Sequence, residues 1–97
     1  MQVQPVAFYW YPSGDDYKKM QSSAEDGANL HETYAEWLIA AEKGIENFKF
    51  RPDITVRKIQ VPTDEFIAWC KSTGHKLNAK SRSAIASHKL YLLMKDD

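Results

Sequence analysis

The chain has 97 residues, of which 43% are hydrophobic and 12% aromatic, and it carries no net charge. This composition excludes a disordered chain, and the length suits one core, so we expect residues 1–97 to form a single domain. No apolar run approaches the ~20 residues of a membrane-spanning helix. The single Cys70 has no partner for an internal disulfide, so we expect a cytoplasmic protein.

The charges are unevenly distributed along the chain. Residues 1–50 have four lysines and eight acidic residues, a net charge of −4, and residues 51–97 have a net charge of +4. No acidic residue occurs between Lys71 and Lys89. Such a segment is typical of a nucleic-acid surface. It also fits the commoner case of a basic region that is solvated or balanced by an acidic region of the same chain or of a second copy.

Residues 2–11 alternate in a way that predicts a β-strand. One face would carry Val6, Phe8 and Trp10, and the other Ala7, Tyr9 and Tyr11. Pro5 lacks a backbone donor, which places the start of this strand at a sheet edge. A short helix then runs to about Ser23, capped by Ser13, Asp15 or Asp16, with Tyr17 and Met20 as its buried pair.

The segment from Asn29 to Phe50 predicts the main helix. Its apolar residues recur at steps of three and four, namely Leu30, Tyr34, Trp37, Leu38, Ala41, Ile45 and Phe48. We expect this face to be the largest stabilising surface of the protein. Two capping signals, Asn29 with Glu32 and Thr33 with Glu36, compete for the start, and we prefer 29–31. Gly44 inside the helix predicts that another backbone or an aromatic ring packs closely there.

Residues 53–61 predict a second strand. Ile54 and Val56 fall on one face and Ile59 and Val61 on the other. A β-bulge at 57–58 would bring all four to one side, and the alternative is a strand covered on both faces.

Two helices complete the chain. Thr63 is expected to cap the first of them, and Gly74 to end it. Asn78 is expected to cap a last helix from Ala79 to about Met94, whose residues 90–94, LYLLM, we expect to face inward. The predicted fold is α+β in the order β-α-α-β-α-α. A small two-stranded sheet, four-stranded in a dimer, packs against a long central helix and a C-terminal helical hairpin.

The helical hairpin of residues 64–94 carries the clearest signal for nucleic-acid binding. A helix, a turn with glycine and a second helix with basic residues near its start have the general form of a helix-turn-helix. The residues that would contact nucleic acid are Lys76, Asn78, Lys80, Arg82 and Lys89. The turn is longer than in the simplest such domains, so this function is our alternative.

Catalytic and metal-binding patterns are weak. Cys70 lies on the expected inner face of a helix, which favours an inert thiol over a nucleophile. The histidines His31, His75 and His88 are scattered singly, without the spacing of metal ligands. We therefore expect no catalytic residue, no metal and no cofactor, and no small-molecule substrate is evident. An enzyme is the second alternative, and it would need Cys70 in an open cleft beside His75 or His88.

An interaction protein is the function that remains. If the two strands pair, each keeps a free edge, and two copies can join edges across a two-fold axis. We therefore predict a non-enzymatic interaction module that self-associates and binds another macromolecule. Its interface would include Phe8, Tyr9, Trp10 and Tyr11. The partner is a protein or a second copy, nucleic acid is the alternative, and no membrane is involved.

Overall fold

The computed structural model describes residues 3–95, which form an α+β fold with a two-stranded parallel sheet and four α-helices. The order along the chain is β1 (Gln4–Trp10), α1 (Gly14–Ser23), the short 3-10 helix η1 (Gly27–Asn29), α2 (Tyr34–Glu46), β2 (Ile54–Gln60), α3 (Thr63–Thr73) and α4 (Ala79–Lys95). The predicted fold class and order are confirmed. The strand prediction for Gln2 lies outside the described residues. Within 3–95, every helix is too short or too polar to cross a bilayer.

The two strands pair without interruption. Gln4 pairs with Ile54, and the register continues one residue at a time to Trp10 and Gln60. The predicted bulge at 57–58 is therefore wrong. The apolar residues of β2 change from one face of the strand to the other because helices cover both faces of the sheet. This is the alternative given for this strand above.

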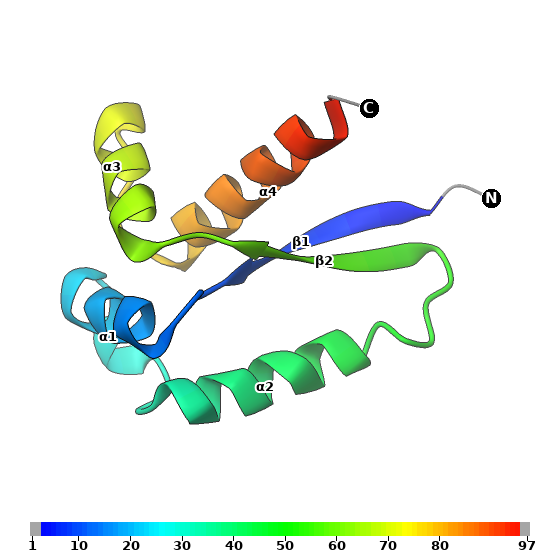
Figure 1. Ribbon diagram of the computed structural model, residues 1–97, viewed down its shortest axis with the longest axis horizontal. Coiled ribbons are helices and arrows are strands. Elements are labelled where there is room, and N and C mark those ends of the chain that lie inside the picture. Colours follow the sequence, from blue (N-terminus) through cyan, green and yellow to red (C-terminus); the bar gives the residue numbers. More distant parts are fainter. Residues whose placement is uncertain (1–2, 96–97) are drawn as a thin grey trace.

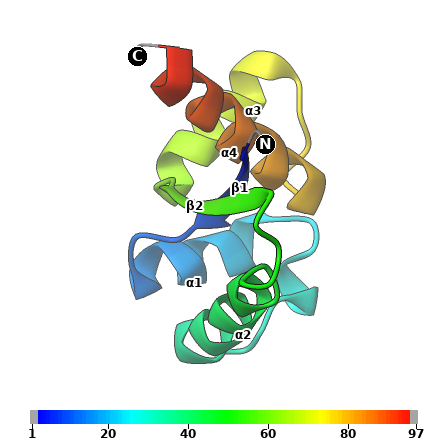
Figure 2. The same cartoon turned by 90° about the vertical axis from the view of Figure 1, so that its right-hand side faces the viewer.

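Helices lie on both sides of the sheet, with α2 on one side and α3 and α4 on the other (Figures 1 and 2). On the α2 side, the rings of Trp10 and Trp37 have centroids 4.8 Å apart. On the opposite side, Tyr9 contacts Phe66 of α3 edge to face at 5.8 Å. β1 begins and α4 ends at the same end of the molecule (Figure 1).

The core lies on the side of the sheet away from α2 and at its carboxyl end. Its largest fully buried side chains are Tyr17, Phe66, Met20, Ile85, Val61, Thr63 and Cys70, so the predicted buried pair of α1 is confirmed. No residue of α2 is fully buried. The prediction that α2 carries the main stabilising face is therefore wrong. A two-stranded ribbon is too narrow to cover a whole helix face, and α2 packs as an outer layer.

The start of α2 follows the second capping signal. The Glu36 N–H donates to Thr33 Oγ1 at 3.1 Å, and the helix begins at Tyr34. The preferred start at 29–31 is wrong, because the Tyr17 hydroxyl donates to the His31 carbonyl at 2.6 Å and holds this segment outside the helix. The prediction that an aromatic ring packs beside Gly44 is confirmed, since the Phe8 ring lies on the side where a Cβ would point.

The start of α3 is capped from another helix. The Thr63 N–H donates to Asp16 Oδ1 at 2.9 Å, and the Thr63 hydroxyl donates to the Asp16 carbonyl at 2.6 Å. The prediction that the Thr63 side chain caps its own helix is wrong, because its hydroxyl is a donor to α1. Gly74 ends α3 with φ 75°, as predicted. Asn78 accepts the Ser81 N–H at 3.1 Å at the start of α4, which also confirms its prediction.

Candidate interaction surface

The backbone of β1 has an open edge. The Gln4 N–H donates to the Asp53 carbonyl at 2.8 Å, so the even-numbered residues of β1 face β2. The backbone groups of Pro5, Ala7 and Tyr9 consequently point to the other edge, where no further strand pairs among residues 3–95. Such an edge can accept an additional strand. Pro5 has a carbonyl there but no donor.

The two open edges of the sheet differ in charge. No charged residue occurs between Val3 and Tyr11, whereas β2 has Arg57 and Lys58 at its centre. The Lys58 ammonium also lies 4.4 Å from the centroid of the Trp10 ring and 2.7 Å from Glu42 Oε1. Charged side chains on an edge strand oppose pairing with other strands. The β1 edge lacks this protection.

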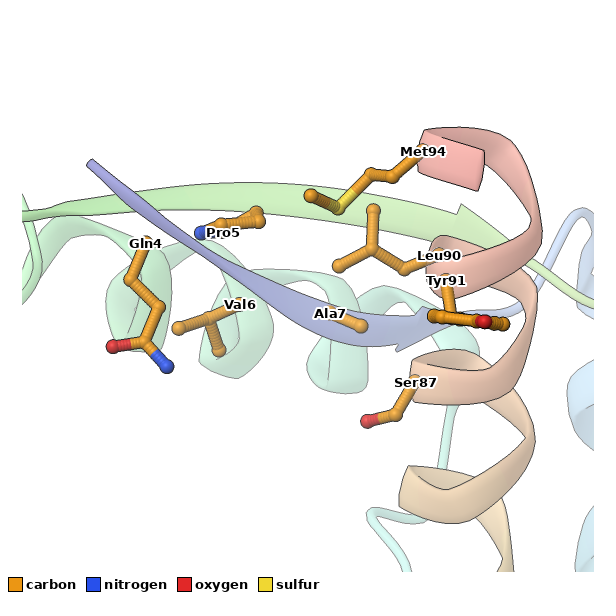
Figure 3. Close-up of a pocket in the computed structure, with 8 residues that line it drawn as sticks. All are labelled: Gln4, Pro5, Val6, Ala7, Ser87, Leu90, Tyr91 and Met94. Carbon is orange, nitrogen blue, oxygen red and sulfur yellow. The ribbon is translucent and has the colours of Figure 1, made fainter. Parts of the chain in front are cut away.

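A groove of about 450 Å³ runs between β1 and α4 (Figure 3). Its walls are Gln4, Pro5, Val6 and Ala7 of β1 and Ser87, Leu90, Tyr91 and Met94 of α4. Pro5 and Ala7 lie on the α4 side of the strand, and Gln4 and Val6 lie on the other side (Figure 3). The groove therefore includes both faces of β1 at its open edge, which is the shape that an added strand requires.

The last turn of α4 presents an apolar surface beside this groove. Seven large hydrophobic residues are exposed within 3–95, and five of them gather at this end of the molecule, namely Val3, Tyr91, Leu92, Leu93 and Met94. Tyr91 is 61% exposed, and only Leu90 of the LYLLM run is buried. The prediction that this run faces inward is therefore wrong. Four consecutive apolar residues span more than one face of a helix, so a narrow sheet cannot cover them all.

The aromatic residues of the predicted interface pack inside the chain. Trp10 and Tyr11 are buried, and Phe8 and Tyr9 are half-buried. Burial raises the pKa of Tyr11 to about 12 and raises that of Tyr9 further, so both phenols stay neutral. What these residues leave accessible is the backbone edge of the strand. The self-association predicted for this strand stays a prediction.

The predicted nucleic-acid residues are partly engaged within the chain. Arg82 is buried and binds both carboxylate oxygens of Asp26, at 3.1 and 2.6 Å. Lys89 binds Glu65 at 2.8 Å, and Asn78 caps α4 while donating to Glu25 at 3.1 Å. Lys76 and Lys80 are exposed. Nucleic-acid binding stays a prediction, with two of its five residues exposed to solvent.

The side chains considered for catalysis have other hydrogen-bond partners. The Cys70 side chain is buried, and its Sγ lies 3.8 Å from the Lys76 carbonyl oxygen. Burial raises the pKa of this thiol, which favours its neutral form. His75 Nδ1 lies 2.7 Å from Thr73 Oγ1, and His88 is exposed on α4. Within the described part of the chain, no three histidine, cysteine or acidic side chains gather as metal ligands would.

Comparisons with known proteins add no assignment, because the chain matches no protein-family model, no curated protein and no solved structure. The candidate surface therefore rests on three features of this chain. These are the uncharged open edge of β1, the groove beside it and the exposed last turn of α4. Sequence patterns predicted a free edge but missed the contribution of residues 91–94. The sequence feature that could have revealed their exposure is the length of the apolar run LYLLM, which is too long for a two-stranded sheet to cover.

Proposed function

We propose that the protein is a non-enzymatic interaction module that self-associates by pairing the open edge of β1 with the same edge of a second copy. The observation that carries this proposal is the uncharged edge of β1 beside a turn of α4 that exposes Tyr91 and Met94. Joining the edges gives a four-stranded sheet in which the two copies of β1 are central. A two-fold axis closes this assembly at two copies.

The sequence of β1 suits antiparallel pairing about Ala7. A two-fold axis at this residue aligns the whole of Gln4–Trp10 with the same residues of the second copy. Ala7 of each copy then exchanges both backbone hydrogen bonds with its counterpart. The Tyr9 N–H donates to the Pro5 carbonyl of the other copy, which uses the one backbone group that proline keeps. Ala7 has the smallest side chain of β1, so two copies can approach closely at the axis.

The β2 edge is a poorer surface for the same purpose. Pairing two copies of β2 about its centre brings Arg57 and Lys58 close to the same residues of the second copy, and like charges across strands are destabilising. Pairing through β1 keeps these cations at the outer edges of the four-stranded sheet, where they oppose further growth.

The wider proposal is that the dimer binds another macromolecule in the cytoplasm. A single cysteine that is buried and reduced supports a reducing compartment. Nucleic acid is the less supported partner, because Arg82, Asn78 and Lys89 already have acidic partners within the chain.

Sedimentation velocity over a wide concentration range tests the self-association. We expect a monomer–dimer equilibrium, weakened at least about tenfold by the double substitution Tyr91→Lys and Met94→Lys. The matched control is Ile39→Lys with Phe50→Lys, since these side chains are also exposed but lie away from the β1 edge. The control should sediment as the original protein does. A folded monomer at all concentrations would exclude the proposal.

Cysteine cross-linking tests the register. In the proposed pair, the Cα atoms of Ala7 and its counterpart lie about 5.5 Å apart, within the range of a disulfide. Oxidised Ala7→Cys should therefore form a covalent dimer. Arg57→Cys, on the same face of β2, should not. A dimer in sedimentation without cross-linking at position 7 would keep self-association and exclude this register.

A further inference from the structure

A second cavity lies far from the β1 edge, between α3 and the turn that leads to α4. It has a volume of about 230 Å³ and is lined by Ile67, Cys70, Lys71, His75 and Leu77. The groove at β1 lies beside the last turns of α4, whereas this pocket lies before its first turn. The groove residues Ser87 to Met94 of α4 lie 8 to 15 residues after Ala79, which is about 12–22 Å along the helix at a rise of 1.5 Å per residue. Occupying one site therefore leaves the other accessible.

The apolar part of the pocket comes from Ile67, Cys70 and Leu77. The volume of the whole pocket is smaller than the ~300 Å³ at which small-molecule and cofactor sites begin. A pocket of this size suits a single large apolar side chain. Binding surfaces commonly take one such side chain as an anchor within a polar surround.

His75 at the mouth of the pocket is held in one orientation. Its ring stacks on Trp69 with centroids 4.6 Å apart, and its backbone N–H donates to the Cys70 carbonyl at 2.9 Å. The Thr73 hydroxyl donates to the Trp69 carbonyl at 2.7 Å, and its oxygen also lies 2.7 Å from His75 Nδ1. These contacts hold the His75 ring against α3.

The surroundings of the pocket are basic. Lys71 lines it, and Lys76 and Lys80 follow along the turn and the first turn of α4. No ion pair within residues 3–95 involves any of these three lysines. No acidic residue lies between positions 71 and 89. Glu25 brings one carboxylate to this turn through its bond with Asn78, and the three lysines outnumber it, so a ligand that enters the pocket meets a net positive charge.

We propose that this pocket binds an acidic peptide segment of a partner protein, which inserts one apolar side chain between Ile67 and Leu77. Carboxylates on either side of that anchor pair with Lys71 and Lys76. This site goes beyond the proposed self-association and does not depend on it. A peptide fits better than duplex nucleic acid, because the lining that accepts the anchor is apolar, whereas the bases of a duplex are stacked inside and its phosphates face outward.

Titration with short peptides, followed by NMR of the backbone amides, tests the proposal. The probe is the pentapeptide Glu-Glu-Leu-Glu-Glu with blocked ends, and its comparison is the same peptide with alanine in place of leucine. We expect saturable shifts confined to residues 67–80, and an affinity at least about tenfold lower for the alanine peptide, because burial of the leucine side chain is lost.

Charge-reversed variants give the matched comparison. Lys71→Glu with Lys76→Glu should reduce the affinity for the leucine peptide at least about tenfold. Lys18→Glu with Lys43→Glu makes the same change in net charge at exposed positions on α1 and α2 and should leave the affinity unchanged. Thermal unfolding of both variants establishes that they are folded.

Three results would overturn the proposal. Equal affinities for the leucine and alanine peptides would show that the pocket is unused, and shifts outside residues 67–80 would move the site elsewhere. Random duplex DNA that displaces the peptide, with an affinity that falls steeply with salt, would assign the lysines to nucleic acid. None of these results bears on the dimer, whose test is sedimentation.

Discussion

The two halves of the chain have the same plan and different burial. Each is a strand followed by two helices, β1-α1-α2 and β2-α3-α4, and each strand leads into its first helix through proline and a hydroxyl residue, Pro12-Ser13 and Pro62-Thr63. Their second helices differ most. α4 buries five residues and α2 buries none. An equal order of elements therefore does not imply an equal share of the core.

The halves are joined by reciprocal contacts between their helices. Asp16 of α1 accepts the first N–H of α3, and Asp64 of α3 pairs with Lys19 of α1 at 2.6 Å. Arg82 of α4 reaches across to Asp26, just after α1. The second half thus stabilises α1 through polar contacts as well as through the shared core. Among the residues that the structure describes, α2 makes a single ion pair with the second half, between Glu42 and Lys58.

Breaking the Arg82–Asp26 pair should have the largest effect on the link between the halves. We expect Arg82→Met to lower the free energy of unfolding by about 3 kcal/mol, because it leaves the partly buried Asp26 carboxylate without its partner. Urea unfolding at neutral pH measures this difference. A loss near zero would show that the aromatic core alone holds α1 to α4.

The same pair predicts a pH dependence. Hydrogen bonds from Arg82 lower the pKa of Asp26 in the folded protein. The stability that this provides is fully present above the unfolded-state pKa of about 4 and is lost as the pH falls through the folded-state value. The difference between the original protein and Arg82→Met should therefore shrink below about pH 4. A constant difference would contradict this assignment.

Removing the cap that α1 provides for α3 should have a smaller effect. Asp16→Ala leaves the Thr63 N–H without its acceptor, and we expect a loss of about 1–2 kcal/mol in thermal or urea unfolding. Asp64→Ala is the control, because its ion pair with Lys19 is exposed to solvent and should contribute little to the free energy of unfolding. Equal losses would mean that the two contacts are equivalent.

Filling Gly44 should have the smallest effect, and it should be favourable. A Cβ at this position lies 3.8 Å from the Phe8 ring, an ordinary contact. We expect Gly44→Ala to raise the free energy of unfolding by about 0.5–1 kcal/mol through helix propensity. Gly74→Ala should lower it by about 1 kcal/mol, since φ there is 75°. A loss at Gly44 would show that α2 packs more tightly on the sheet than its burial indicates.

Local signals in the sequence predicted much of the fold. The alternation in β1, the pair Tyr17 and Met20, and the glycine that ends α3 each depend on a few neighbouring residues, and each is confirmed. Periodicity also identified the apolar face of α2. It could not predict what covers that face, because burial depends on the width of the sheet and on where the other helices lie.

The candidate site was harder to predict, because it too depends on how the whole fold is arranged. The sequence between Val3 and Tyr11 is uncharged and aromatic, which drew attention to its side chains. The structure packs those side chains inward and leaves the backbone edge accessible. An open edge is a property of the whole sheet, so no single segment encodes it. The exposure of residues 91–94 likewise depends on how far α4 extends beyond the sheet on which it packs.

Although α2 contributes little to the core, its length has a clear role. Parallel strands require the chain to return to its starting side before the second strand begins. The 13 residues of α2 span about 20 Å at 1.5 Å per residue, and a seven-residue strand spans about 23 Å. The length of the helix therefore matches the distance from the end of β1 back to the start of β2, and its exposed residues can diverge freely as long as that length is kept.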